Sequence, residues 1–148
     1  MSINAEYLVR CLDTLKKSYE LIQTVEEGSI EYEMYRNSLV NGFEMTLEQS
    51  GKILKKRIAP YFSSKKNVDA LNFKDLFRYV HKFSLLDQEE IQRWFSYRDN
   101  RNNTAHDYGQ AFAEKSITLV ENFIHDVENL PVSFQNEILK NYIVIYNK

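Results

Sequence analysis

Residues 30–59 read IEYEMYRNSLVNGFEMTLEQSGKILKKRIA, and Pro60 follows them directly. Apolar side chains recur along this stretch at helical spacing, which places them on one face of an α-helix. The members of that face are Tyr35, Leu39, Phe43, Leu47, Leu54 and Ile58. Because proline cannot continue a helix interior, Pro60 ends the predicted helix. At 1.5 Å per residue the helix is about 4 nm long, which suits the spine of a helical bundle.

The segment before this helix predicts a partner for it, running from Asn4 to Glu26. Its apolar residues recur at spacings of four and three and form one stripe. The stripe consists of Leu8, Leu12, Leu15, Tyr19 and Ile22. Gly28 follows and is suited to the left-handed conformation that often ends a helix.

Two glycines, Gly42 and Gly51, lie inside the long predicted helix. Each costs about 1 kcal/mol relative to alanine in a helix interior. We therefore expect them to permit the close approach of another helix or of a partner chain.

The region after Pro60 predicts a basic connection and then a short helix. Residues 61–71 contain Ser63-Ser64-Lys65-Lys66-Asn67, which is typical of a mobile loop. Asn72 is suited to cap the short helix, which we expect to end near Phe83.

Three more helices are predicted towards the C-terminal side. Asp87 with Glu90 three residues later forms a capping-box pattern at the start of the first of them. That helix is expected to fray near residues 101–104, where asparagines and a threonine gather. The other two helices are predicted over residues 110–128 and 133–146, with Pro131 between them.

These elements predict an all-α fold, an antiparallel helical bundle of four main helices plus short helices. Residues 1–148 are expected to form a single domain, in which residues 131–148 are a C-terminal helical extension. Cys11 is the only cysteine, so no internal disulfide forms, which favours a cytoplasmic location. We expect no membrane span and no secretion signal, because no long apolar run and no basic-then-apolar N-terminus occurs.

Charge is distributed unevenly along the chain. Residues 1–49 carry four basic and nine acidic side chains, and residues 84–148 carry six basic and ten acidic ones. Residues 52–83 carry nine basic side chains against two acidic ones. This basic middle can bind a polyanion or an acidic partner, or it can be an ordinary solvated helix face. The candidate nucleic-acid-binding residues are Lys52, Lys55, Lys56 and Arg57.

Most catalytic signatures are absent from the sequence. It holds no phosphate-binding glycine loop, no pair of cysteines for zinc and no His-Glu-x-x-His pattern, so we expect neither a metal nor a cofactor. His81 and His125 stand alone in predicted helices, which favours structural or surface roles.

The segment Arg101-Asn102-Asn103-Thr104-Ala105-His106-Asp107-Tyr108 gathers polar groups of several kinds. Arg101 can stabilise a developing negative charge on a phosphate, and His106, with an ordinary pKa near about 6.5, can move a proton at neutral pH. Asn102 can orient either group, and Tyr108 can donate to a phosphate or stack on a base. These residue types suit metal-independent phosphodiester cleavage. The alternative is that the histidine and an asparagine only cap the fraying end of a helix.

The pattern Arg101-x4-His106-x-Tyr108 resembles the motif of HEPN-type proteins. The chain as a whole resembles the nucleotidyltransferase substrate-binding family over about residues 30 to 127. The stretches that carry this likeness are Arg36-Asn37-Ser38-Leu39-Val40, Phe43-Glu44-Met45-Thr46-Leu47-Glu48, Lys52-Ile53-Leu54-Lys55, Ser84-Leu85-Leu86-Asp87, Trp94 and Asp99 to Tyr108. The chain departs from the family at Gly51, where a tryptophan is usual, and at Asn41-Gly42, where Gln-Arg is usual.

The resemblance implies a HEPN-like bundle that forms a homodimer and works with a small nucleotidyltransferase. Proteins with the intact motif are often metal-independent ribonucleases whose two motif copies face each other. In HepT-like toxins the nucleotidyltransferase antitoxin can attach adenylate to the motif tyrosine, here Tyr108. Three hypotheses follow: a ribonuclease toxin that acts through Arg101 and His106, a non-catalytic subunit that binds substrate or nucleotide for the nucleotidyltransferase, and a structural dimer.

Overall fold

In the computed structural model, residues 3–107 and 117–132 are described, and all their regular elements are helical. The order is α1 (Glu6–Ile22), α2 (Ile30–Ile58), the short 3₁₀ helix η1 (Ala59–Tyr61), α3 (Lys65–Asp69), α4 (Phe73–Lys82), α5 (Gln88–Asp107) and α7 (Ile117–Glu128). The predicted all-α bundle is confirmed. In this part of the chain no helix is long and apolar enough to cross a membrane.

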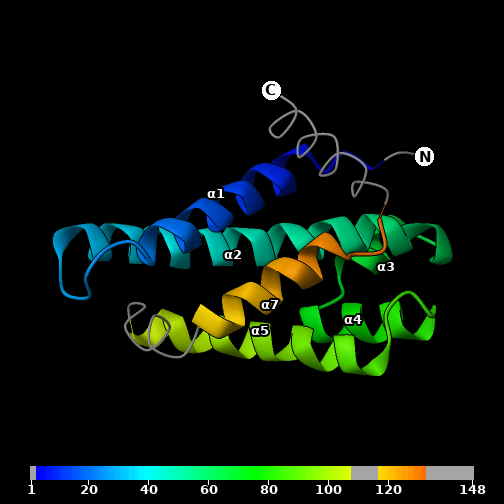
Figure 1. Ribbon diagram of the computed structural model, residues 1–148. Coiled ribbons are helices and arrows are strands. Elements are labelled where there is room, and N and C mark those ends of the chain that lie inside the picture. The colour runs from blue at the N-terminus through cyan, green and yellow to red at the C-terminus, as the bar shows by residue number, and fades with distance from the viewer. Residues whose placement is uncertain (1–2, 108–116, 133–148) are drawn as a thin grey trace.

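The long helix α2 runs through the middle of the molecule (Figure 1). The helix α1 packs against it in the opposite direction, while α4 and α5 lie on its other side. The helix α7 crosses α2 in the view and contacts both α1 and α5. The C-terminal end of α2 therefore lies at one end of the bundle, and the C-terminal end of α5 lies at the other (Figure 1).

The limits of α2 follow from local chemistry that the sequence predicts well. Gly28 has a φ of +92°, a left-handed conformation that glycine adopts at no steric cost. The Ser29 side chain then accepts a hydrogen bond from the amide of Tyr32 at 3.1 Å, which caps the helix. At the other end, Pro60 lies within η1, two residues beyond the last residue of α2.

Two predictions about local structure are wrong. Residues 61–71 are not a structureless connection, because Ser64 caps the short helix α3, in which Val68 is only 1% exposed. The helix α5 also does not fray near residues 101–104 but continues to Asp107. It contains no glycine or proline, and the weak helix propensities of Asn and Thr cost only a few tenths of a kcal/mol each.

The predicted helix over residues 110–128 is observed as α7 from Ile117. Residues 108–116, and with them the start that we predicted, lie outside the described residues. The helix predicted over residues 133–146 lies outside them as well.

The core is built around a cluster of aromatic rings. Phe123 of α7 lies 4.6 Å from Phe43 of α2 and 5.7 Å from Trp94 of α5, measured between ring centroids. Trp94 stacks in turn on Phe77 of α4 at 5.1 Å. All four side chains are fully buried, so this cluster joins four helices in a dry centre.

The two glycines of α2 play different roles. A Cβ atom at Gly42 would lie 3.3 Å from the Cα of Leu15 and 3.4 Å from its Cβ, so α1 and α2 approach each other closely here. At Gly51 a Cβ would only meet a terminal methyl of Leu76 at 3.9 Å, which is ordinary contact. The expected close approach is therefore present at Gly42 and not at Gly51.

We predict opposite effects for the two alanine substitutions. Gly51→Ala should raise the free energy of unfolding by up to about 1 kcal/mol, because alanine favours the helix and has space. Gly42→Ala should lower it by about 1–3 kcal/mol, because the added methyl forces two backbones apart. Urea denaturation of both variants measures the difference. Equal stabilisation by the two substitutions would contradict the close contact at Gly42.

Candidate functional site

The helix that carries the Arg101 segment begins with the predicted capping box. The Asp87 side chain accepts a hydrogen bond from the amide of Glu90 at 2.8 Å, and the Glu90 side chain accepts one from the amide of Asp87 at 3.2 Å. These reciprocal bonds satisfy amides that a helix start otherwise leaves unpaired. They fix the first residue of α5 and, with it, the register of every residue that follows.

A polar network ties the middle of α5 to α7. The carboxylate of Asp126 is 4% exposed and accepts two hydrogen bonds from Arg93, both at 2.9 Å. It also accepts a short hydrogen bond from the hydroxyl of Tyr97. Burial raises the pKa of the Tyr97 hydroxyl, and the bond to Asp126 raises it further, so this group remains a donor. The hydrogen bond to Asp126 likewise raises the pKa of Arg93.

The next turn of α5 carries two arginines, Arg98 and Arg101. Arg101, four residues after the buried Tyr97, is half-buried. The guanidinium of Arg98 lies 5.3 Å from the centre of the Phe73 ring, which holds it against α4. Burial lowers the pKa of Arg98, and the positive charge of Arg101 lowers it further. The two positive charges are therefore close enough to interact.

The sequence interpretation missed Arg98, although its spacing could have indicated it. Arg98, Asn102 and His106 follow one another at intervals of four, which places their backbone positions along one side of α5. Arg101 and His106 are five residues apart, which is a rotation of about 140° around the helix axis. The position of Arg98 lies between them around the helix. The side chains from Asn102 to Asp107, and all of Tyr108, lie outside the described part.

The helix-capping alternative does not suit Arg101. Arg101 lies more than one turn inside α5, which ends at Asp107. Its own backbone groups are therefore part of the regular helix, and its side chain is not needed to end it.

Two buried donors lie on the helices that meet near this end of the bundle. The Nε atom of Arg36 in α2 and the Nδ2 atom of Asn100 in α5 are shielded from solvent and have no acceptor among the described residues. Since these groups are already desolvated, an oxygen from a ligand or a partner chain that reached them would bind more strongly than at an exposed site.

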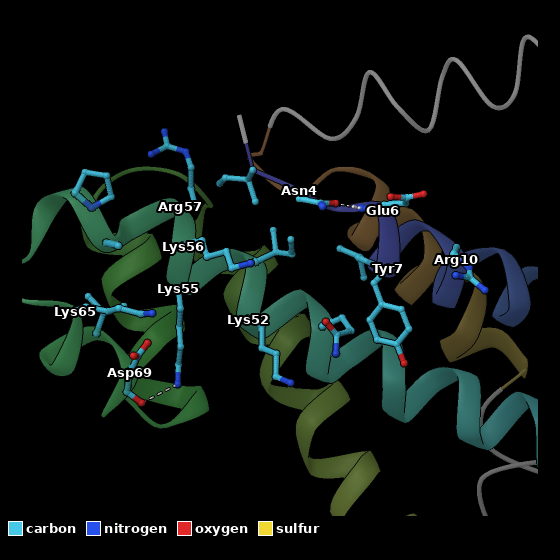
Figure 2. A pocket seen from close by; sticks show the side chains of 17 residues that line it. Asn4, Glu6, Tyr7, Arg10, Lys52, Lys55, Lys56, Arg57, Lys65 and Asp69 are labelled. Atoms are coloured by element: carbon cyan, nitrogen blue, oxygen red, sulfur yellow. Dashed lines mark hydrogen bonds between the residues drawn. The ribbon is translucent and has the colours of Figure 1, made fainter. Parts of the chain in front are cut away.

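The predicted basic residues do come together, but elsewhere. Lys52, Lys55, Lys56 and Arg57 all line a cavity of about 1100 Å³ between the start of α1 and the C-terminal half of α2 (Figure 2). That half of α2 is at the opposite end of the bundle from the C-terminal end of α5 (Figure 1). The two candidate sites are therefore separate within one chain.

The other two histidines make local hydrogen bonds. The Nδ1 atom of His81 lies 3.1 Å from the carbonyl oxygen of Leu86, and the Nε2 atom of His125 lies 3.2 Å from the side-chain nitrogen of Asn129. Both contacts tie the ends of helices to the turns that follow. Among the described residues, no three His, Cys, Asp or Glu side chains are grouped so that they could hold a metal ion.

Comparison with known proteins finds a matching family and a similar curated protein. The family described as nucleotidyltransferase substrate binding protein like matches residues 4–136. A curated protein named "Probable ribonuclease HepT", from Haemophilus influenzae, is 28% identical over 116 residues, which cover 72% of this chain and 78% of that protein. No solved structure matches the chain significantly.

We predict that Asp126→Ala lowers the free energy of unfolding by about 1–3 kcal/mol, because it leaves the buried hydroxyl of Tyr97 without an acceptor. The control is Asp99→Ala, which removes an exposed ion pair with Lys74 (3.6 Å) and should change stability by less than about 0.5 kcal/mol. Urea denaturation compares the two. A loss no larger than that of the control would show that the network does not hold α5 to α7.

Proposed function

The chain belongs to the nucleotidyltransferase substrate binding protein like family, and from this membership we propose that it is a metal-independent ribonuclease paired with a small nucleotidyltransferase. The observation that carries the proposal is the pair of guanidiniums near the end of α5, where burial lowers the pKa of Arg98 and the neighbouring charge of Arg101 lowers it further. The similarity to a protein named as a probable ribonuclease supports the same activity.

The proposed chemistry uses the chain's own side chains. His106 takes the proton from a ribose 2′-hydroxyl, and the 2′-oxygen attacks the adjacent phosphorus. Arg101 and Arg98 stabilise the negative charge that builds up on the phosphate oxygens. The bond to the 5′-oxygen breaks, and that oxygen receives a proton from a second, protonated His106. The products are a 2′,3′-cyclic phosphate and a free 5′-hydroxyl.

The second His106 requires a second copy of the chain, so we propose a homodimer. The rotation of about 140° between the positions of Arg101 and His106 supports this, since one helix presents them in different directions. Ile30 and Met34 support it as well. These side chains are 74% and 61% exposed, lie one turn apart on α2, and belong to the same end of the bundle as the end of α5.

The description of the family favours a second candidate function. A non-catalytic subunit could hold a nucleotide or present a substrate to a nucleotidyltransferase, and the same arginines would then bind phosphate without cleaving it. Modification of Tyr108 with adenylate by a nucleotidyltransferase partner also remains a prediction. The added phosphate would place negative charge where we propose that RNA phosphate binds.

We predict that Arg101→Ala and His106→Ala each reduce RNA cleavage by about 10²–10³-fold or more, because they remove charge stabilisation and proton transfer in the transition state. The control is Arg78→Ala, which removes an exposed arginine of α4 and should leave cleavage unchanged. A gel assay with chelator present measures cleavage, and circular dichroism checks the fold. Wild-type protein that binds nucleotide but cleaves no RNA would contradict the ribonuclease and support the substrate-binding subunit.

We predict that the protein sediments as a dimer at micromolar concentration. Stable dimers of this kind commonly bury about 2,000 Å² or more in total. Ile30→Asp with Met34→Asp should shift the protein to monomer and abolish cleavage, because both substitutions place charge in the proposed interface. Tyr61→Asp, at an exposed aromatic near the other end of α2, is the control and should leave the dimer intact. A monomeric wild type would contradict the composite site.

A further inference from the structure

The cavity beside α2 has a strongly cationic lining. Its wall is formed by the start of α1, the C-terminal half of α2 and the short helix α3 (Figure 2). Two carboxylates, those of Glu6 and Asp69, also line it. The cationic lining residues are Arg10, Lys52, Lys55, Lys56, Arg57 and Lys65, which gives a balance of +4. A hollow surface of one charge sign concentrates ligands of the opposite sign.

Three of these cations already have partners. Lys55 donates a hydrogen bond to the backbone oxygen of Asp69 at 3.1 Å, and Arg57 donates one to the backbone oxygen of Pro131, also at 3.1 Å. Lys52 forms an exposed ion pair with Glu48 at 3.5 Å. The first two bonds use neutral acceptors, so the positive charges of Lys55 and Arg57 remain uncompensated.

The other three cations are available to a ligand. Within residues 3–107 and 117–132, the side chains of Arg10, Lys56 and Lys65 make no ion pair or hydrogen bond with another residue. They come from α1, α2 and α3 respectively, so three different helices contribute free positive charge to the cavity.

The cations are spread along the cavity and do not converge on one point. Figure 2 shows Arg10 near one end, Lys65 near the other end, and Lys52 and Lys56 between them. Lys52 and Lys56 are four residues apart, a rise of about 6 Å along α2. A single phosphate would need its donors around one position, whereas successive phosphates of a nucleic-acid strand match charges placed in a row.

An aromatic ring and an apolar floor accompany the charges. Tyr7 is 51% exposed and lies at the rim, at the same end of the cavity as Arg10 (Figure 2). Leu8, Ile53 and Val68 contribute apolar lining. An exposed ring beside a cationic groove is the combination that binds single strands, because every base can stack on it. An acidic polypeptide would use the charges but gain little from the ring.

We propose that this cavity binds a single-stranded RNA segment and holds the substrate away from the cleavage site. The choice of RNA as ligand rests on the proposed function. Since the cavity and the end of α5 lie at opposite ends of the bundle, the cavity anchors a long strand while a separate part of it reaches Arg101. Loss of the cavity charges should therefore raise KM for long RNA and leave kcat, and the cleavage of very short RNA, unchanged.

The test compares two double variants of equal charge change. Lys56→Glu with Lys65→Glu alters the cavity, and Lys66→Glu with Lys82→Glu alters exposed lysines of the same basic region that do not line it. The probe is fluorescent oligouridylate of about 20 nucleotides, bound to protein that also carries His106→Ala so that it is not cleaved. Anisotropy at several salt concentrations gives the affinity and its salt dependence.

The cavity variant should lose about tenfold or more in affinity, and its slope of log affinity against log salt should flatten by about 1.4, or about 0.7 for each phosphate contact. The control pair should change affinity much less. Tyr7→Ala should weaken binding by about tenfold through lost stacking. Equal losses in the two double variants would overturn the proposal, because they would reflect overall charge and not the cavity.

Polyglutamate of matched charge tests whether an acidic polypeptide binds in the cavity in place of RNA. If it binds as tightly as oligouridylate and Tyr7→Ala has no effect on either, the cavity binds an acidic polypeptide and the proposal is wrong. A different result would contradict the ribonuclease proposal without contradicting the binding site. Wild-type protein that cleaves no RNA, but whose binding depends on the cavity as described, would overturn the cleavage chemistry and leave the binding site standing.

Discussion

A single ring, that of Phe123, connects three helices of the bundle. It lies 4.6 Å from Phe43 of α2, 5.0 Å from Tyr97 of α5 and 5.7 Å from Trp94, also of α5. Such aromatic pairs are worth about 0.5–1.5 kcal/mol each beyond the area that they bury. Because Phe123 is fully buried between α2 and α5, the position of α7 and the spacing of those two helices are set together. The part of α5 beyond this contact carries the candidate catalytic residues.

Apolar packing sets a distance between helices but tolerates some rotation, whereas hydrogen bonds to a buried carboxylate are directional. Asp126 receives donors from Arg93 and Tyr97, which lie one turn apart on α5. This arrangement fixes the rotation of α5 against α7. A shift of one residue in that register would turn the helix by about 100°, and Arg98 and Arg101 would then face in other directions. The polar network therefore supports the proposed site without being part of it.

Helix existence could be predicted from the sequence, because periodicity, Gly28 and the Asp87 capping box are local signals. The C-terminal end of α5 could not be predicted from the sequence. The weak helix propensity of residues 101–104 suggested that the helix frays there, whereas the observed helix continues to Asp107. The helix α3 was missed because Val68 is held by tertiary burial. Arg98 was missed because its spacing to His106 matters only when the helix extends that far. The apolar stripe predicted that α1 packs against α2, but it does not describe how the start of α1 and the helix α3 enclose a cavity beside Lys52 and its neighbours.

The contact between Gly42 and Leu15 also bears on how the chain folds. The helices α1 and α2 are neighbours in the sequence, and only a short turn around Gly28 separates them. Closing a short loop costs little chain entropy, so contacts between such neighbours form early. The buried contact between Phe43 of α2 and Phe123 of α7 joins residues 80 positions apart and must wait for more of the chain to be placed. The α1–α2 hairpin is thus suited to be the folding nucleus, against which the half that bears the candidate catalytic residues is assembled last.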